Sequence, residues 1–193
     1  FCATLAFLLS ISAMAYCLQC GHQADLCIPT GDSRARLVCP ACQYIHYENP
    51  KVITGTLCVF DGKILLCKRA IEPRLGFWTL PAGFLELGET MCDGAVRETK
   101  EEAEAVAYMP RLYTLFDIPH FGQIHAIYLA QLKDGQFGAG TESLECRLFA
   151  PSDLPCDIAF ASVAQTLDYY KKDVARFGND LASYPLHQTV ITT

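Results

Sequence analysis

The chain contains two hydrophobic runs, VITGTLCVF at 52–60 and KILLCKRA at 63–70, that are separated by Asp61-Gly62. β-branched and aromatic residues favour extended chain, and a two-residue Asp-Gly connection is typical of a tight hairpin turn. The pattern therefore predicts two antiparallel strands joined by this turn.

Other hydrophobic segments predict four more stretches of extended chain and one amphipathic helix. The extended segments are 77–86, interrupted at Pro81 and Gly83, and 108–118, 124–133 and 145–150. Residues 160–172, FASVAQTLDYYKK, have the spacing of an amphipathic helix. A charged helix is expected to start where Thr90 and Asp93 can form a cap and to run to about Ala105. These elements predict an α+β domain with a mixed sheet.

The length of 193 residues and the net charge of −6, with a pI near 5.3, limit the classes of function. The length suits one medium-sized domain with a small appendage and is sufficient to bury a hydrophobic core. A general nucleic-acid-binding protein would carry a basic face, so the acidic balance argues against that class. The balance suits a protein that handles an anionic small molecule through metal ions rather than through a lysine patch.

Four of the eleven cysteines form two C-x-x-C pairs that are separated by 18 residues. Cys17 pairs with Cys20, and Cys39 with Cys42. Two thiolate pairs at this spacing are typical of a tetrahedral zinc site. A disulfide pair or redox C-x-x-C motifs are the alternatives, but two pairs at this spacing favour zinc. We predict a structural zinc ribbon at 17–46, because four thiolates leave no open coordination position.

The first 16 residues form an apolar run whose role is open to two interpretations. The run is too short to span a bilayer, so no membrane association is expected. It ends in Ala13-Met14-Ala15, which resembles a signal-peptidase site, and an exported protein is therefore the alternative. We favour Met14 as the true start and residues 1–13 as extraneous, because no basic segment precedes the run. The many scattered cysteines outside the ribbon favour a reducing compartment, the cytoplasm.

The segment GETMCDGAVRETKEE at 88–102 concentrates acidic and basic side chains on the predicted charged helix. Spacings of three and four residues put Glu98, Glu101 and Glu102 on one side of a helix. Like charges at these spacings repel, so the cluster costs stability unless a cation lies against it. A solvated charged face is one interpretation, and a site for a hard metal ion with oxygen ligands is the other.

The order of residues around this cluster favours the metal site. It runs Gly83, five residues, Glu89, seven residues, Arg97-Glu98, two residues, Glu101-Glu102. This order resembles the box of the Nudix hydrolases, G-x5-E-x7-R-E-U-x-E-E-x-G-U, where U is a bulky aliphatic residue. Two positions depart from it: Thr99 stands at an aliphatic position, and Glu104 stands where the second glycine is expected. Neither departure removes a metal ligand.

The resemblance implies an α/β/α Nudix sandwich with a mixed sheet at 47–175, followed by a C-terminal tail at 176–193. It also implies hydrolysis of a diphosphate with Mg²⁺ or Mn²⁺. Glu98 and Glu102 are then the core ligands, with Glu101 assisting and a backbone carbonyl near Ala82 added.

The resemblance also assigns supporting roles. Arg97 would pair with Glu89 and orient the loop that enters the helix. Thr99 should affect stability more than chemistry. Glu104 would cost on the order of 1 kcal/mol if the backbone there keeps the left-handed turn.

The resemblance extends from the ribbon through IHYENPKVITG and LFDIPHFGQIH to about residue 175. It is to a zinc-ribbon Nudix subgroup that includes enzymes cleaving FAD and ADP-ribose. We therefore expect a dinucleotide-type substrate, FAD (cleaved to FMN and AMP) before ADP-ribose. NADH or NAD-capped RNA is the enzymatic alternative, but the S-Q-P-W-P-F-P-type segment of NADH pyrophosphatases has no match after Glu102. A non-enzymatic zinc-ribbon module that binds RNA or protein is a further alternative, and the ribbon leaves room for a homodimer.

Substrate contacts are expected from basic and aromatic residues near the box. The candidates are Arg69 and Arg74 for phosphate oxygens, and Phe77, Trp78, Tyr113, Phe116 and Phe121 for stacking on adenine or flavin. For the two arginines the alternative is an ordinary surface salt bridge, and for the aromatic residues it is a position in the core. Glu142 or Glu145 would supply an additional acid on a late loop, as general base or third-metal ligand, and we favour Glu142.

Overall fold

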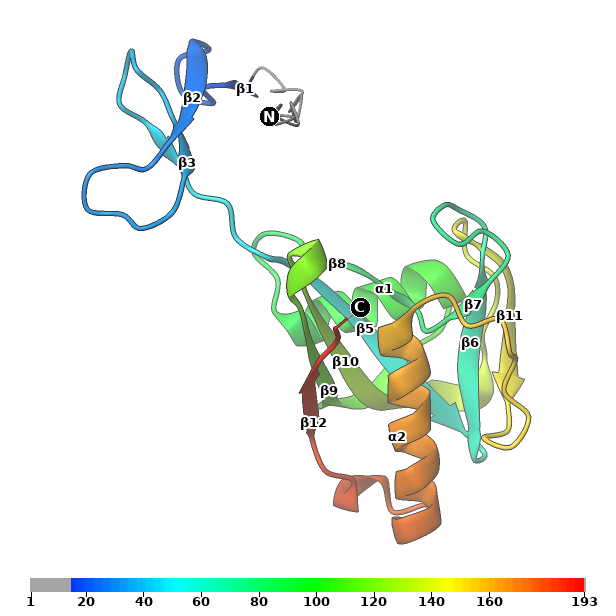
Figure 1. The fold of residues 1–193 in the computed structure, drawn as a ribbon. Coiled ribbons are helices and arrows are strands. Elements are labelled where there is room, and N and C mark those ends of the chain that lie inside the picture. The colour runs from blue at the N-terminus through cyan, green and yellow to red at the C-terminus, as the bar shows by residue number, and fades with distance from the viewer. Residues whose placement is uncertain (1–14, 193) are drawn as a thin grey trace, which may run out of the picture. The chain divides into compact units, whose positions relative to one another are not determined.

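The computed structural model describes residues 15–192, so the predictions for residues 1–13 lie outside the described part. The chain divides into two compact units between Asn49 and Pro50, and each has its own sheet (Figure 1). No helix within residues 15–192 is long and apolar enough to cross a membrane.

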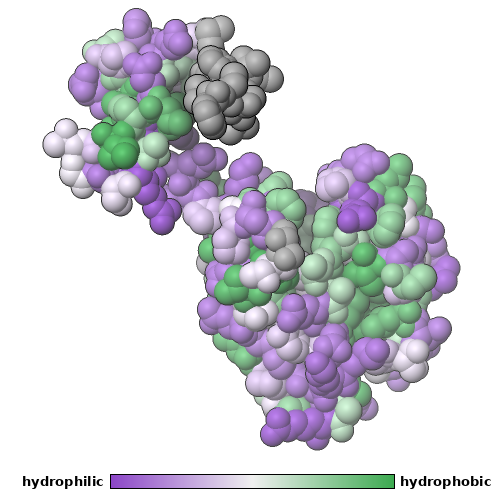
Figure 2. All heavy atoms as spheres, in the orientation of Figure 1, coloured by the Kyte–Doolittle hydropathy of each residue, from purple (hydrophilic) through white to green (hydrophobic). Residues whose placement is uncertain are grey.

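The N-terminal unit is a small antiparallel sheet held around two cysteine turns. Its strands, in spatial order, are β1 (Ala15–Tyr16), β2 (Gln23–Cys27), β3 (Arg36–Val38) and β4 (Ile45–His46). The turn from β1 to β2 carries the first C-x-x-C pair, and the turn from β3 to β4 carries the second. Hydrophobic side chains reach the surface of this unit (Figure 2). Leu18, Leu26 and Ile28 are among the exposed ones.

The second unit is built on a mixed sheet with the strand order β11-β6-β5-β10-β9-β12. The strands are β5 (Lys51–Phe60), β6 (Lys63–Arg69), β7 (Trp78–Thr79), β8 (Ala82–Phe84), β9 (Ala107–Ile118), β10 (Gln123–Leu132), β11 (Ser143–Phe149) and β12 (His187–Val190). β7 pairs with β6, and β8 pairs with β5. The β5–β10 and β9–β12 pairs are parallel, whereas the other described pairs of this sheet are antiparallel.

The predicted hairpin is confirmed as β5 and β6. Val59 lies opposite Ile64, and the turn residues Asp61 and Gly62 both have positive φ. The predicted break at Gly83 is wrong, because Gly83 lies inside β8 and pairs with β5. Its lack of a side chain is needed for a close contact rather than for a turn.

The sheet is covered by one helix on each face, α1 (Met91–Ala103) and α2 (Ala161–Phe177) (Figure 1). Successive side chains of β5 point to opposite faces of the sheet and pack against different helices. Leu57 and Val59 pack in the cluster that contains Val163 of α2, whereas Cys58 between them packs in the cluster that contains Ala103 of α1. The fold is therefore the α+β sandwich with a mixed sheet that the sequence predicts.

Helix α1 begins at the predicted cap and ends two residues before the predicted end at about Ala105. The Thr90 side chain accepts a hydrogen bond from the Asp93 backbone N–H at 3.1 Å. The helix ends at Ala103, and the residue that caps it, Glu104, has φ 46° and ψ 32° and is therefore left-handed. A non-glycine side chain in this conformation costs on the order of 1 kcal/mol.

Short helices and a late strand complete the second unit. The 3-10 helices are η1 (Pro119–Phe121), η2 (Lys133–Gly135) and η3 (Leu181–Ser183). The segment 176–193, for which the sequence predicts no element, contributes η3 and β12. β12 lies parallel to β9, with His187 opposite Thr114.

Candidate active site

The three glutamates of α1 differ in their surroundings. Glu102 is 6% exposed, the Glu98 side chain is 12% exposed and the Glu101 side chain is 58% exposed. Glu98 and Glu102 are one turn apart and both lie toward β8, whereas Glu101 reaches into solvent. The helix therefore presents two of its carboxylates to the strand and one to its outer side.

Strand β8 approaches these carboxylates through its backbone. The Glu102 carboxylate accepts a hydrogen bond from the Ala82 N–H at 3.3 Å. The Glu98 carboxylate lies against Gly83, where an added Cβ would come within 2.5 Å of the carboxyl carbon and both oxygens. Real Cβ atoms do not approach other atoms so closely, so glycine at position 83 is a condition of this arrangement.

Arg97 connects the acidic residues around the start and the middle of α1. Its guanidinium donates to both carboxylate oxygens of Glu89, at 3.1 and 2.8 Å, and to the Phe84 carbonyl at 3.2 Å. The same side chain donates to Glu98 at 2.7 Å and to Glu101 at 3.0 Å. Glu89 also accepts from the backbone N–H of Glu86 at 2.8 Å, which closes the loop that enters the helix.

The acids differ in the direction in which their surroundings shift their pKa values. The hydrogen bonds from Arg97 hold the pKa of Glu89 at about 2. Burial raises the pKa of Glu102 to about 8, and the nearby Glu98 adds to this effect. Burial also raises the pKa of Glu98, although Arg97 opposes the rise. Buried carboxylates without a full complement of donors are hard oxygen ligands that a divalent cation fits.

The loop between η2 and β11 docks against the C-terminal end of α1. Gly138 donates its N–H to the Ala103 carbonyl at 2.8 Å, and Gly140 donates to the Glu102 carbonyl at 3.0 Å. An added Cβ on Gly140 would lie 1.8 Å from the Glu101 carbonyl oxygen. The two glycines therefore satisfy carbonyls that the helix leaves free, and at Gly140 a larger residue would prevent the close approach.

Docking of this loop brings Glu142 to the site. Its charge contributes to the raised pKa values of Glu98 and Glu102. The alternative acid, Glu145, instead forms an ion pair with Arg147 on β11. Of the two late acids considered from the sequence, Glu142 is the one whose charge acts on Glu98 and Glu102.

Thr99, at the aliphatic position of the box, is fully buried under the sheet. Its hydroxyl lies 2.6 Å from the Thr56 hydroxyl of β5 and donates to the Ala95 carbonyl at 2.7 Å. A hydrogen-bonded pair of threonines therefore stands at a contact between helix and sheet where an aliphatic side chain is expected. The sequence carries no signal that would have identified Thr56 as the partner.

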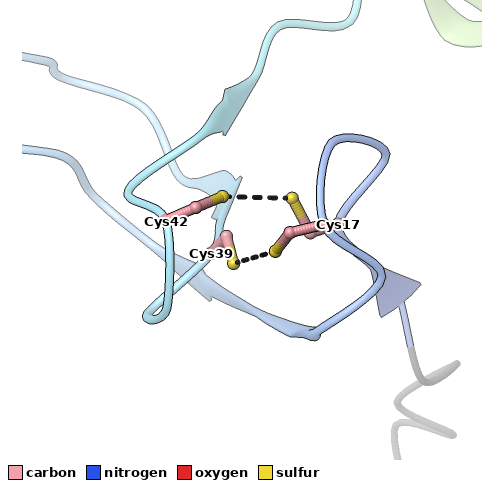
Figure 3. Close-up of side chains that lie close together, drawn as sticks. Cys17, Cys39 and Cys42 are labelled. Atoms are coloured by element: carbon pink, nitrogen blue, oxygen red, sulfur yellow. Dashed lines mark hydrogen bonds between the residues drawn. The ribbon is translucent and has the colours of Figure 1, made fainter.

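The four ribbon cysteines converge in the N-terminal unit (Figure 3). Their sulfur atoms all lie within 4.8 Å of one another, with Cys17 to Cys42 and Cys20 to Cys39 at 3.5 Å each. Sulfurs around a tetrahedral zinc with Zn–S bonds of about 2.3 Å are roughly 3.8 Å apart. The cluster is therefore compatible with a zinc ribbon.

The backbone supports the same geometry in both turns. The N–H of Cys17 donates to the His22 carbonyl at 2.7 Å, and the N–H of Cys39 donates to the Tyr44 carbonyl at 2.9 Å. The residue after each second cysteine is left-handed: Gly21 with φ 71° and Gln43 with φ 64°.

Arg69 is the basic candidate that lies at the acidic site. Its charge opposes the rise in the pKa of Glu102 that burial causes, and its Nε donates to the Pro73 carbonyl at 2.8 Å. Arg74 lies on the loop that follows β6, over the ring of Phe77 at 5.5 Å, and is exposed. Phe77 is partly buried.

Three aromatic candidates are corrected by the structure. Phe116 is 0% exposed and stacks on Tyr169 of α2, with ring centroids 6.5 Å apart. Tyr113 is also 0% exposed and donates its hydroxyl to Asp173 at 2.6 Å. Both lie on the face of β9 that α2 covers, so neither ring has a free face for a ligand. Trp78 is likewise a core residue, with its ring edge against Phe149. Phe121 remains exposed.

Comparison with known proteins identifies the family. Residues 50–170 match the model of the NUDIX domain, and residues 15–48 match a zinc-ribbon model described as Nudix N-terminal. The chain belongs to the Nudix family of hydrolases, and it carries the N-terminal zinc-ribbon domain found with that family. The resemblance noted in the box is thus confirmed for the family and for the enzyme class.

Named relatives include two kinds of pyrophosphohydrolase. The chain is 31% identical over 133 residues to the ADP-ribose pyrophosphatase of Methanocaldococcus jannaschii, covering 67% of this chain and 78% of that protein. It is 24% identical over 158 residues to the NAD-capped RNA hydrolase NudC of Photobacterium profundum, covering 81% of this chain and 58% of that protein. The chain thus spans little more than half of this NudC relative.

A solved structure resembles both units of the chain. The crystal structure of a NUDIX hydrolase from Nitrosomonas europaea aligns with a TM-score of 0.87 and 43% identity. The alignment covers 93% of this chain and 100% of that one.

Proposed function

We propose that the protein hydrolyses the diphosphate bond of a nucleoside diphosphate linked to another group, with Mg²⁺ or Mn²⁺ held by Glu98 and Glu102. The buried carboxylate of Glu102 supports this proposal most directly. Within residues 15–192 it accepts a single hydrogen bond, from Ala82, although burial and neighbouring carboxylates disfavour its charge. A divalent cation would stabilise that charge.

The donor set fits a hard cation, because carboxylate and carbonyl oxygens are the ligands that Mg²⁺ and Mn²⁺ prefer. Glu98 and Glu102 are the proposed core ligands, with Glu101 adjacent and the Ala82 backbone completing the set. When bound, the cation neutralises diphosphate charge and favours ionisation of the attacking water.

The protein's own groups have separate proposed roles. Arg97 is a positioning residue, since it holds Glu89, Glu98 and Glu101 in one network. The charge of Arg69 acts on Glu102, and Arg69 would hold a phosphate oxygen through the two guanidinium nitrogens to which residues 15–192 offer no hydrogen-bond acceptor. Glu142 is the proposed general base, because its loop brings it to the metal-binding acids rather than to a salt bridge.

The substrate proposed first is ADP-ribose. The alignment to the ADP-ribose pyrophosphatase of Methanocaldococcus jannaschii covers 78% of that protein, whereas the alignment to the Photobacterium profundum NudC covers 58% of that one. FAD follows, since the burial of Tyr113 and Phe116 removes the aromatic wall that would have favoured a flavin ring. Both substrates share an ADP half, and the proposed product in each case is AMP.

The test is a comparison of kcat/KM for ADP-ribose, FAD, NADH and a nucleoside triphosphate, in Mg²⁺ and in Mn²⁺. ADP-ribose should lead and release AMP. Glu98→Gln and Glu102→Gln should each lose nearly all turnover and bind Mn²⁺ weakly. Glu104→Gln is the matched control at the same helix end, and it should retain both. Full activity in either of the first two variants, or a triphosphate as the best substrate, would contradict the proposal.

A second candidate is hydrolysis of NADH or of NAD-capped RNA. The similarity to NudC proteins favours it, because the alignment to the Photobacterium profundum protein covers 81% of this chain. The absence of the S-Q-P-W-P-F-P-type segment after Glu102 argues against it. Release of nicotinamide mononucleotide from NAD-capped RNA at a kcat/KM above that for ADP-ribose would establish this candidate instead.

A further inference from the structure

Two cysteines outside the ribbon face each other beside the catalytic helix. Cys67 of β6 and Cys146 of β11 are direct partners in the antiparallel register, and their sulfur atoms are 3.2 Å apart. Both are free thiols. Cys67 is 1% exposed, whereas Cys146 is partly exposed.

The backbone geometry suits a bond between them. Opposite residues of an antiparallel pair have Cα atoms about 4.5–5.5 Å apart, within the range of about 4.4–6.8 Å that disulfides span. The register is regular from Glu145 opposite Lys68 to Phe149 opposite Ile64. A bond of about 2.05 Å requires the sulfurs to close by roughly 1 Å, which side-chain rotation can supply.

The pair also contacts the helix that carries the proposed metal ligands. The Cys146 thiol donates to the Glu102 carbonyl at 3.5 Å, and the same carbonyl accepts from Gly140. Both cysteines pack with Ala103, the last residue of α1. A bond between the sulfurs removes the thiol donor and draws Cys146 toward Cys67, so the end of α1 loses one of its contacts.

We propose that Cys67 and Cys146 form a reversible disulfide when the protein meets a hydroperoxide, and that this bond weakens cation binding at Glu98 and Glu102. The coupling to the cation rests on the proposed function, whereas the oxidation itself does not.

The partly exposed Cys146 reacts first. Its sulfur attacks one oxygen of the hydroperoxide, the O–O bond breaks, and an alcohol or water leaves while a sulfenic acid forms. The Cys67 sulfur then attacks the sulfur of Cys146, the S–O bond breaks, and hydroxide leaves as water with the thiol proton. Two thiols thus lose two electrons to the hydroperoxide, and a dithiol reductant reverses the change.

The test uses the zinc-loaded full chain treated with hydrogen peroxide and mapped by peptide mass spectrometry. We expect a linked peptide pair that contains Cys67 and Cys146 and has lost two hydrogen atoms. The apparent Kd for Mn²⁺ should rise about fivefold or more and recover with dithiothreitol, in keeping with typical coupling between sites. Cys156→Ser, at an exposed cysteine outside the pair, should behave like the wild type, and Cys146→Ser should show neither change.

Each outcome bears on a separate part of the proposal. Absence of the linked peptide in the wild type overturns the site, whether or not the variants fold. A linked protein with an unchanged Kd for Mn²⁺ overturns the coupling to α1. If the reduced wild type fails to bind Mn²⁺, both the coupling and the proposed metal site are overturned. The presence or absence of the linked peptide then still shows whether the disulfide forms.

Discussion

The carboxylate of Glu98 lies against the backbone of Gly83, in space that any side chain at position 83 would occupy. One residue belongs to a strand and the other to a helix, and their contact brings β8 and α1 together at the proposed metal site. The glycine of the box is therefore a requirement of close packing, since its backbone does not need a positive φ.

Gly83→Ala should consequently damage the site more than the fold. A methyl group within 2.5 Å of the carboxylate forces Glu98 to move. We expect kcat/KM to fall by about tenfold or more, equivalent to about 1.4 kcal/mol or more of lost stabilisation. Steady-state kinetics with ADP-ribose and thermal unfolding check this. A variant with wild-type kinetics and a lowered melting temperature would show that the contact serves packing alone.

Glu104→Gly should stabilise the protein. Glu104 holds a left-handed conformation with φ 46°, which glycine adopts without the steric cost of a Cβ. The gain should be about 1 kcal/mol, or roughly 2–4 °C in Tm for a chain of this size. Glu104→Ala is the matched control, since alanine keeps the cost and should bring no gain. Equal effects of the two substitutions would contradict the explanation.

The Thr56 and Thr99 hydroxyls should be strongly coupled in stability. Thr99→Val removes the 2.6 Å hydrogen bond and leaves a buried hydroxyl on Thr56 without this partner, at a cost of about 1–3 kcal/mol. Thr56→Val combined with Thr99→Val should recover most of that loss, because both polar groups are then gone. Urea unfolding of both single variants and the double variant measures the coupling. Additive losses would show that the two hydroxyls act independently.

The N-terminal unit should require zinc for its structure, whereas the second unit should not. Elemental analysis of protein purified without chelator should find about one zinc per chain, as expected for one tetrahedral cluster. Cys39→Ser should lose that zinc, because the Cys39 sulfur lies in the cluster and is 1% exposed. Cys27→Ser is the control at an exposed cysteine outside the cluster. Calorimetry should show an unchanged main transition from the second unit, and zinc retained by Cys39→Ser would contradict the ribbon.

Stability should fall in mild acid because of His125. Burial lowers the pKa of His125 in the folded protein to about 4, and its ring nitrogens lie near Ser162 and Gln123 at 2.9 and 3.1 Å. In the unfolded chain the pKa is about 6.5. Between pH 6.5 and pH 4, His125 is therefore protonated in the unfolded chain but neutral in the folded protein. The free energy of unfolding then decreases by up to about 1.4 kcal/mol per pH unit.

Comparison with His125→Gln isolates this contribution from those of other groups. The difference in free energy of unfolding between wild type and variant should be constant above pH 6.5 and should change progressively between pH 6.5 and 4. Denaturant unfolding across this range measures the difference. Parallel curves for the two proteins would contradict the assigned pKa.

Local patterns in the sequence were sufficient for the box helix, the hairpin and the cysteine cluster. In each case the residues that matter are close in the chain, or are brought together by one turn type. Thr90 and Asp93 are separated by less than one helical turn, and Asp61-Gly62 permits one tight connection. Glu104 stands at a glycine position of the box, and its backbone keeps the left-handed conformation that the box glycine implies.

Contacts between distant segments were decided by the tertiary structure. Alternation along a strand shows which residues share a face, but not which face a helix will cover. The sequence therefore leaves Phe116 and Tyr113 as candidates for stacking on a ligand, whereas in the fold α2 buries both rings. For the same reason, no pattern in the sequence pairs Cys67 with Cys146, which are 79 residues apart.

The sequence by itself determined the family, the positions of the acidic box and the ribbon cysteines, because these depend on spacing along one segment. The tertiary structure decided which of those acids are buried, that the loop before β11 docks on α1 through Gly138 and Gly140, and that β12 completes the sheet. These features depend on packing between segments far apart in the chain. Their energies arise from burial and close contact, which a linear pattern does not contain.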